Sequence, residues 1–201
     1  MCKIPENYFT DNDTLWLARD LIGKKLITKN QNSEITAGII TETEAYLGVN
    51  DLASHASGNR YTNRTATMYR KGGIAYVYLC YGIHYLFNIV TQKENTPHAI
   101  LIRGILATQG IHTMIQRTGK SSIGLIDGPG KLTKAMGISM VQNGQSLTGA
   151  TIWLQMGDIR ISRSEILTTP RIGVDYAGED AQLPYRFLLS PVGIGRLKKL
   201  Y

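Results

Sequence analysis

The sequence predicts one domain of the α+β class, a compact mixed fold in which helices flank a mostly antiparallel sheet. Its 201 residues suit a single domain spanning residues 1–201, which is large enough to fold without disulfides or metal. Segments that resemble strands outnumber those that resemble helices, and no repeat, low-complexity run or linker separates them. Hydrophobic residues make up 43% of the chain and charged residues 18%, which excludes a disordered or fibrous protein.

Three helices are expected. The first, Asp13–Ile22, begins with residues that can cap a helix and is followed by Gly23, which can end one. Two shorter helices are expected at Gln109–Arg117 and Lys131–Met136, the second of them directly after a turn rich in glycine.

Segments rich in branched and aromatic residues predict the strands. The longest is Thr36–Leu47, which is rich in isoleucine and threonine and ends before Gly48. The pair Tyr81-Gly82 lies between two such segments and predicts a hairpin or a tight corner. In chain order, the expected strands are Lys25–Thr28, Thr36–Leu47, Ala75–Cys80, His84–Thr91, Ala99–Leu106, Ile152–Leu154, Asp158–Ser162, Thr169–Gly173 and Tyr185–Leu189.

The polar segment Val49–Thr67 contains glycine and asparagine and is expected to be a long loop. A structureless loop of this length is unusual in a compact domain unless it has a function. We therefore expect this segment to contribute to a site.

The positive charge of the chain is concentrated in one stretch. The formal net charge is +7, and Leu52–Ile126 contains eight lysines and arginines but one acid, Glu94, while the rest of the chain is balanced. All four histidines and six of the eleven tyrosines also lie in this stretch. Such a composition is typical of a nucleic-acid surface, although a solvated basic face that binds nothing in particular fits it equally well.

Four basic residues are candidates for contacts with a nucleic-acid backbone. Three of them, Arg60, Arg64 and Lys71, lie in the basic stretch. The fourth is Lys131, in the turn Gly128-Pro129-Gly130-Lys131, which exposes backbone N–H groups to an anion before a helix. This turn lacks the spacing of a phosphate-binding P-loop, so alone it is a weak signal.

Two carboxylates lie near the end of the longest expected strand. Glu42, Glu44 and Tyr46 share one face of it, and the two glutamate backbones are roughly 6.5–7 Å apart. One carboxylate could act as a general base while a partner holds the other, or both could face solvent on a half-exposed strand. Because catalytic groups favour strand ends and the loops that follow, the position favours function.

Several other residues could be functional or structural. His55 is either a hydrogen-bond donor to a substrate or an ordinary loop histidine. Tyr76 and Tyr78 share one face of an expected strand, and packing is the structural interpretation of Tyr76. Tyr81 could enter a gap between bases or be buried at its corner. Asn88 lies within a strand, where it either reads a base or joins a structural network. Arg103 could pair with a carboxylate or a phosphate.

The cysteines and the start of the chain restrict the type of protein further. Cys2 and Cys80 lack the spacing of a zinc site and cannot form a disulfide framework. The first residues lack the apolar core of a signal peptide, and no apolar run is long enough to span a membrane. We therefore expect an intracellular protein of the cytoplasm or nucleoid with no membrane partner.

Several motifs occur together and in order along most of the chain, from Leu17 to Phe187. They are Glu42–Gly48, Asp51–His55, Tyr76–Gly82 followed by Asn88, Gly128–Leu132 and Arg171–Val174. With these motifs the sequence resembles the alkyladenine DNA glycosylase family, also called the 3-methyladenine DNA glycosylase family. It departs from the family pattern at Thr62-Asn63-Arg64, where a proline is usual, and after Arg103, where a Glu-Pro pair is usual.

The resemblance implies a curved antiparallel sheet that holds a base pocket. It also implies a monofunctional glycosylase that excises alkylated or deaminated purines, of the 3-methyladenine, 7-methylguanine, hypoxanthine and ethenoadenine type, from duplex DNA. No cofactor and no metal are expected, and with water as the nucleophile no lysine Schiff base is needed. We expect the protein to act as a monomer.

The resemblance further implies a role for each candidate residue. Glu44 corresponds to the general base that activates water. The other residues are implied to surround the extruded base and the DNA: Tyr46, His55 and Tyr78 as pocket walls, Asn88 as a floor residue that rejects the exocyclic amine of guanine, Tyr81 as the intercalating side chain, and Arg103 near the water and a phosphate.

Two alternatives stay open. A glycoside hydrolase could use Glu42 and Glu44 as its carboxylate pair, although a sugar cleft has no need of the basic stretch. A nucleic-acid-binding module without catalysis could use the tyrosines as a stacking surface. In such a module a carboxylate such as Glu44 would have no role, since it repels phosphate.

Overall fold

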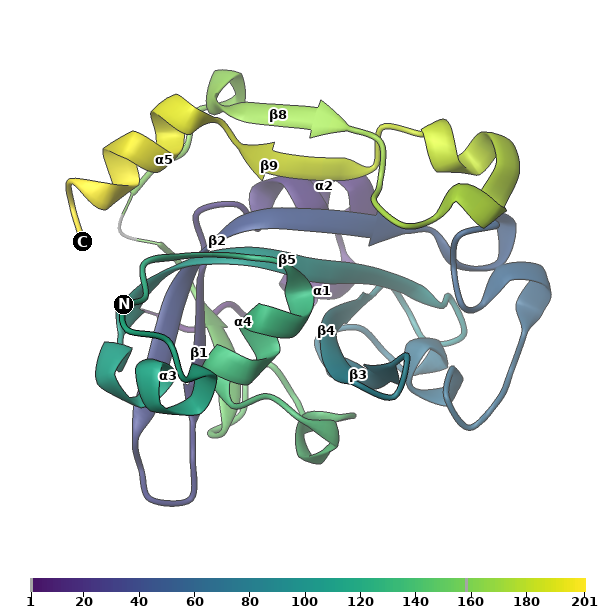
Figure 1. The fold of residues 1–201 in the computed structure, drawn as a ribbon. Helices are drawn as coiled ribbons and strands as arrows, with labels where there is room; N and C mark the ends of the chain where they lie inside the picture. The colour runs from purple at the N-terminus through teal and green to yellow at the C-terminus, as the bar shows by residue number, and fades with distance from the viewer. Residues whose placement is uncertain (1, 158) are drawn as a thin grey trace.

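The computed structural model describes residues 2–157 and 159–201. Its sheet contains nine strands, listed here in chain order: β1 (Lys25–Lys29), β2 (Ile35–Tyr46), β3 (Ala75–Cys80), β4 (His84–Thr91), β5 (His98–Gln109), β6 (Leu125–Asp127), β7 (Ile152–Gln155), β8 (Ile166–Thr169) and β9 (Arg186–Leu189). The main path runs in the order β3-β4-β5-β2-β1-β7, with β6 beside β5 and with β9 between β2 and β8. Each of these pairings is antiparallel. The predicted α+β class with a curved antiparallel sheet is thus confirmed (Figure 1).

The two long central strands, β2 and β5, bend where their register shifts. Shifts occur on both sides of Glu42, which faces Gly104 on β5. Bulges of this kind bend a strand and redirect its side chains. A Cβ atom at Gly104 would lie 2.9 Å from Oγ1 of Thr41. Glycine is therefore required where the two strands approach closely, next to Arg103.

Helices pack against both of these strands. The α-helices are α1 (Asn7–Thr10), α2 (Thr14–Asp20), α3 (Ile111–Thr118), α4 (Pro129–Met136) and α5 (Pro191–Lys198). Figure 1 shows α4 lying across β5 next to β4, with α3 beside it. Helix α2 is capped as predicted, because the side chain of Asp13 accepts hydrogen bonds from the backbone N–H groups of Leu15 and Trp16. The core between helices and sheet includes Phe87 and Leu132, both fully buried.

The predicted hairpin joins β3 and β4. Ile83 N donates to Cys80 O at 3.0 Å, which closes a turn over Tyr81 and Gly82. Both central residues have positive φ, +50° at Tyr81 and +72° at Gly82. This backbone is the one that suits the twist of a two-stranded hairpin.

The segment between β2 and β3 is not structureless, contrary to the expectation of a long loop over Val49–Thr67. It is built from three short 3₁₀ helices, η1 (Gly48–Asn50), η2 (Ser57–Asn59) and η3 (Ala66–Tyr69). The remaining 3₁₀ helices are η4 (Met140–Gln142), η5 (Arg163–Glu165) and η6 (Asp175–Gln182).

Two late strands were predicted wrongly. Of the expected strand Asp158–Ser162, Asp158 lies outside the described residues, and residues 159–162 form no strand. The strand expected at Thr169–Gly173 lies earlier, because β8 ends at Thr169 and Pro170 cannot donate to a ladder. Among the described residues, no helix has the length and apolar character needed to cross a bilayer.

Candidate active site

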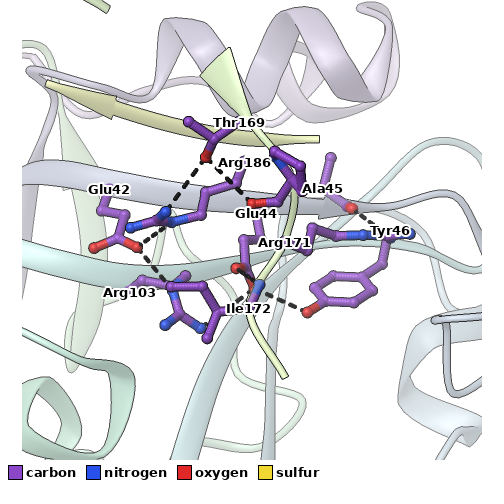
Figure 2. A network of polar contacts seen from close by, with 10 residues as sticks. Glu42, Glu44, Ala45, Tyr46, Arg103, Thr169, Arg171, Ile172 and Arg186 are labelled. Carbon is purple, nitrogen blue, oxygen red and sulfur yellow. Dashed lines mark hydrogen bonds and ion pairs between the residues drawn. The ribbon is translucent and has the colours of Figure 1, made fainter. Parts of the chain in front are cut away.

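Glu44 is fully buried near the end of β2, and three groups donate hydrogen bonds to its carboxylate (Figure 2). The backbone N–H of Ile172 donates to Oε1 at 2.8 Å. The hydroxyl of Tyr46 donates to Oε2 at 2.9 Å, and Nη1 of Arg103 lies 3.4 Å from the same oxygen. Donors from β2, from β5 and from the segment after β8 therefore converge on this side chain.

Glu42 lies on the same side of β2, as the alternation predicted, but its environment differs. Its Oε1 accepts from Nε of Arg103 at 2.8 Å and from Nε of Arg186 at 2.7 Å. Arg103 thus bridges the two carboxylates (Figure 2). Two guanidinium groups hold Glu42, which makes it a charge partner of the arginines.

The surroundings of Glu44 change its acidity. Burial raises the pKa of Glu44 above its ordinary value, against the opposing effects of Arg103, the Ile172 N–H and the Tyr46 hydroxyl. Burial, together with the charge of Glu44, holds the pKa of Tyr46 well above its ordinary range, so its hydroxyl keeps its proton and donates. A carboxylate with a raised pKa is suited to accept a proton near neutral pH.

A cavity of about 400 Å³ opens beside this network. Its lining brings together seven of the site residues that the sequence predicted: Tyr46, His55, Arg64, Tyr78, Tyr81, Asn88 and Arg103. Glu44 does not line the cavity; its donors Tyr46, Arg103 and Ile172 do. The carboxylate therefore lies directly behind the cavity wall.

Aromatic side chains form one side of the cavity. The rings of His55 and Tyr78 meet edge to face, with centroids 4.7 Å apart. Nδ1 of His55 is 2.9 Å from the hydroxyl of Tyr76, a residue for which packing was the structural interpretation. Tyr76 is buried but also lines the cavity, so it belongs to the site. Burial, followed by the charges of Arg64 and Arg60, lowers the pKa of His55 to about 4.

Asn88 lies on β4 opposite Tyr76 of β3 and is almost completely buried. Its Nδ2 donates to the backbone oxygen of Tyr76 at 3.1 Å, and its side chain also lines the cavity. A buried amide held in this way presents a fixed polar surface to anything that enters.

Tyr81 lies at the tip of the β3–β4 hairpin and is 93% exposed. Burial in the core, the structural alternative for this residue, is therefore excluded. Its ring stands at the rim of the cavity on a backbone with positive φ, which is uncommon for a residue with a bulky side chain. Strained, exposed aromatic residues are found at sites of function.

Arg171 also supports the site, although it was not predicted as a site residue. Both of its terminal nitrogens donate to the carboxylate of Asp51, and the pair is buried. The guanidinium also lies over the ring of Tyr46, 4.9 Å from its centroid. Arg171 directly precedes Ile172, so this ion pair holds the backbone N–H that faces Glu44.

The remaining basic candidates lie elsewhere. Arg60, Lys71 and Lys131 are exposed, and none of them lines the cavity. Lys71 pairs with Glu6 at 2.9 Å, and Lys131 pairs with Asp127 at 3.0 Å. Arg64, by contrast, lines the cavity. Within the described ranges, no group of three or more histidine, cysteine, aspartate or glutamate side chains could hold a metal ion.

Comparison with known proteins shows the family of the chain. The family model described as methylpurine-DNA glycosylase (MPG) matches residues 8–191. The chain belongs to this family. The match covers β2, the β3–β4 hairpin and Arg171, and therefore every residue of the cavity and of the glutamate network.

Similar curated proteins come from several bacteria, and each of those described here is named "Putative 3-methyladenine DNA glycosylase". The relative from Chlamydia felis is 46% identical over 190 residues, which cover 93% of this chain and 96% of the relative. The relative from Chlamydia pneumoniae is 45% identical over 197 residues, which cover 96% of this chain and 98% of the relative. The relative from Alkaliphilus oremlandii is 40% identical over 194 residues, which cover 92% of this chain and 95% of the relative.

Proposed function

We propose that this protein is a monofunctional DNA glycosylase of base excision repair. It hydrolyses the N-glycosidic bond of alkylated or deaminated purines, such as 3-methyladenine, 7-methylguanine, hypoxanthine and ethenoadenine, in duplex DNA. The observation that carries the proposal is the buried carboxylate of Glu44 directly behind the wall of a tyrosine-lined cavity. The names of the curated relatives support the same class of substrate.

In this proposal, Glu44 removes a proton from the attacking water. Breaking the bond between purine and sugar leaves positive charge on the sugar, which a nearby carboxylate stabilises. Arg103 and the Ile172 N–H hold the carboxylate in place. Glu44 is fully buried, so the attacking water reaches it from the adjoining cavity.

The cavity receives the damaged base after it has left the duplex. A base within the stack is out of reach of any side chain, so the nucleotide must be flipped out. Tyr46, His55 and Tyr78 form aromatic walls that stack on an electron-poor ring, and Asn88 forms the floor that rejects the amine of guanine. Tyr81, exposed at the hairpin tip, fills the gap that is left in the duplex.

Contacts with the DNA backbone come from the basic stretch. Arg60 and Lys71 of this stretch, together with Lys131 in the turn before α4, neutralise phosphates without reading sequence. The protein acts as a monomer in this proposal.

The glycoside hydrolase alternative is weaker in this geometry. A carboxylate pair in such an enzyme flanks the scissile bond from two sides. Here Glu42 and Glu44 are both bound to Arg103, and neither lines the cavity.

Base release from a defined duplex tests the proposal. A duplex with one hypoxanthine or one alkylated purine is incubated with the protein, and the free base and the strand are analysed separately. We expect free base and an intact strand that carries an abasic site. Binding without release would support the module without catalysis, and strand cleavage by the protein itself would contradict a monofunctional mechanism.

A further inference from the structure

The side chain of Arg64 reaches over the cavity from the segment between η2 and η3. Its guanidinium carbon lies 4.5 Å from the centroid of the Tyr78 ring, and Nη2 lies 3.3 Å from Nε2 of His55. Both partners are cavity walls. Although the residue as a whole is exposed, its charged end therefore lies at the mouth of the cavity.

The contact with Arg64 fixes the state of His55. A guanidinium can only donate hydrogen bonds, so Nε2 of His55 accepts from it and Nδ1 carries the proton toward Tyr76. Burial and Arg64 together keep this imidazole neutral at pH 7. The histidine therefore leaves the charge of Arg64 uncompensated.

Among the described residues, the charge of Arg64 also lacks a carboxylate partner. Arg103, the other cation of the cavity lining, is paired with Glu42 and Glu44. In the part of the chain that the structure describes, Arg64 forms no ion pair, and no aspartate or glutamate lines the cavity. A flipped base therefore enters past an unpaired positive charge.

We propose that Arg64 is a specificity-determining residue that disfavours purines carrying a positive charge relative to neutral purines. The inference rests on the proposed function. A planar guanidinium stacks on an aromatic ring in the same way as a planar base, so an entering purine must displace Arg64 from Tyr78 or lie beside it. A purine alkylated on a ring nitrogen is cationic and is repelled by Arg64, whereas hypoxanthine is neutral and is not.

Arg64 therefore opposes the attraction that the aromatic walls exert on cations. Its removal should shift the preference of the enzyme toward cationic lesions. If Arg64 instead turned outward to contact a phosphate, its removal would lower the efficiency of base release from every lesion by the same factor.

The test compares two duplexes that differ only in the lesion, 7-methylguanine or hypoxanthine, at one ionic strength. Single-turnover efficiency is measured for the wild type, Arg64→Gln, Arg64→Lys and Arg60→Gln. Arg60 is a matched control because it is a neighbouring exposed arginine that does not line the cavity.

We expect Arg64→Gln to raise the ratio of the efficiency on 7-methylguanine to that on hypoxanthine by about fivefold or more. The reason is that the substitution removes a partly screened repulsion from the cationic base. Arg64→Lys should keep the wild-type ratio, because the charge remains. Arg60→Gln should lower both efficiencies by one factor and leave the ratio unchanged. An unchanged or lower ratio in Arg64→Gln overturns the proposal. Release of neither base by the wild type would instead contradict the proposed function itself.

Discussion

The hydroxyl of Tyr46 donates a hydrogen bond of 2.9 Å to Oε2 of Glu44, two residues earlier on the same strand. The ring of Tyr46 lines the cavity, whereas the carboxylate of Glu44 lies behind it. This bond therefore connects the surface that a base touches to the group proposed to activate water. Because a hydrogen bond to the charged form favours that form, Tyr46 also influences the acidity of Glu44.

Removal of this hydroxyl should change the pH dependence of catalysis. The hydrogen bond from Tyr46 lowers the pKa of Glu44, so Tyr46→Phe should raise that pKa while keeping the aromatic wall. The acidic limb of the single-turnover rate, measured from about pH 5 to pH 8, should then move to higher pH. A limb at the same pH in Tyr46→Phe and the wild type would show that the bond does not act on the base.

The wild-type profile should itself reflect the burial of Glu44. Since burial raises its pKa, Glu44 keeps its proton to a higher pH than an ordinary glutamate, and base release should increase as pH rises above 4.5. His55 should add no inflection near neutral pH, because its pKa is lowered to about 4. A second inflection near 6.5, the ordinary histidine value, would contradict a neutral His55.

Tyr81→Ser should weaken base flipping without affecting stability. A ring stacked in the gap restores ~1–3 kcal/mol of lost stacking, so the ratio of flipped to stacked base should fall by about 5- to 100-fold. A base-analogue fluorophore beside the lesion reports this change. Because Tyr81 is 93% exposed, the melting temperature should not change. A lowered melting temperature with normal flipping would disprove the role of Tyr81 as the intercalating side chain. Tyr81→Trp should retain much of the function, because it keeps a stacking ring.

Asp51→Asn should destabilise the fold. It removes the charge that compensates the buried guanidinium of Arg171, and breaking such a buried pair costs roughly 3–5 kcal/mol. In a domain of this size, thermal unfolding should then begin several degrees lower. Glu6→Gln is the matched control: it breaks the exposed pair with Lys71 and should leave the melting temperature unchanged.

Local sequence patterns were sufficient to predict the central elements of the fold. The cap at Asp13, the alternation that places Glu42 and Glu44 on one face and the Tyr81-Gly82 turn all depend on neighbouring residues. Helix α5 was missed, although Ser190 caps it and Pro191 starts it, because its glycines weaken the helical pattern. Strand β6 was also missed, because it has three residues and is defined by its pairing with β5.

The parts of the site that depend on distant residues could not be predicted. Arg171 and Asp51 are 120 positions apart, and no local pattern relates them. The donor from Ile172 is a backbone N–H, which any residue other than proline would supply. The position of Arg64 over Tyr78 likewise appears only after folding, so the sequence predicted a phosphate contact alone.

The most direct test of the central claim is single-turnover base release by Glu44→Gln beside Glu42→Gln. Gln keeps the shape of Glu44 and removes the base, so release should fall by about 10²–10⁴-fold while binding to the lesion stays intact or becomes tighter. Glu42→Gln should cost much less, because Glu42 serves as the partner of Arg103 and Arg186. A rate close to wild type in Glu44→Gln, or equal losses in both variants, would contradict the assignment of Glu44 as the base.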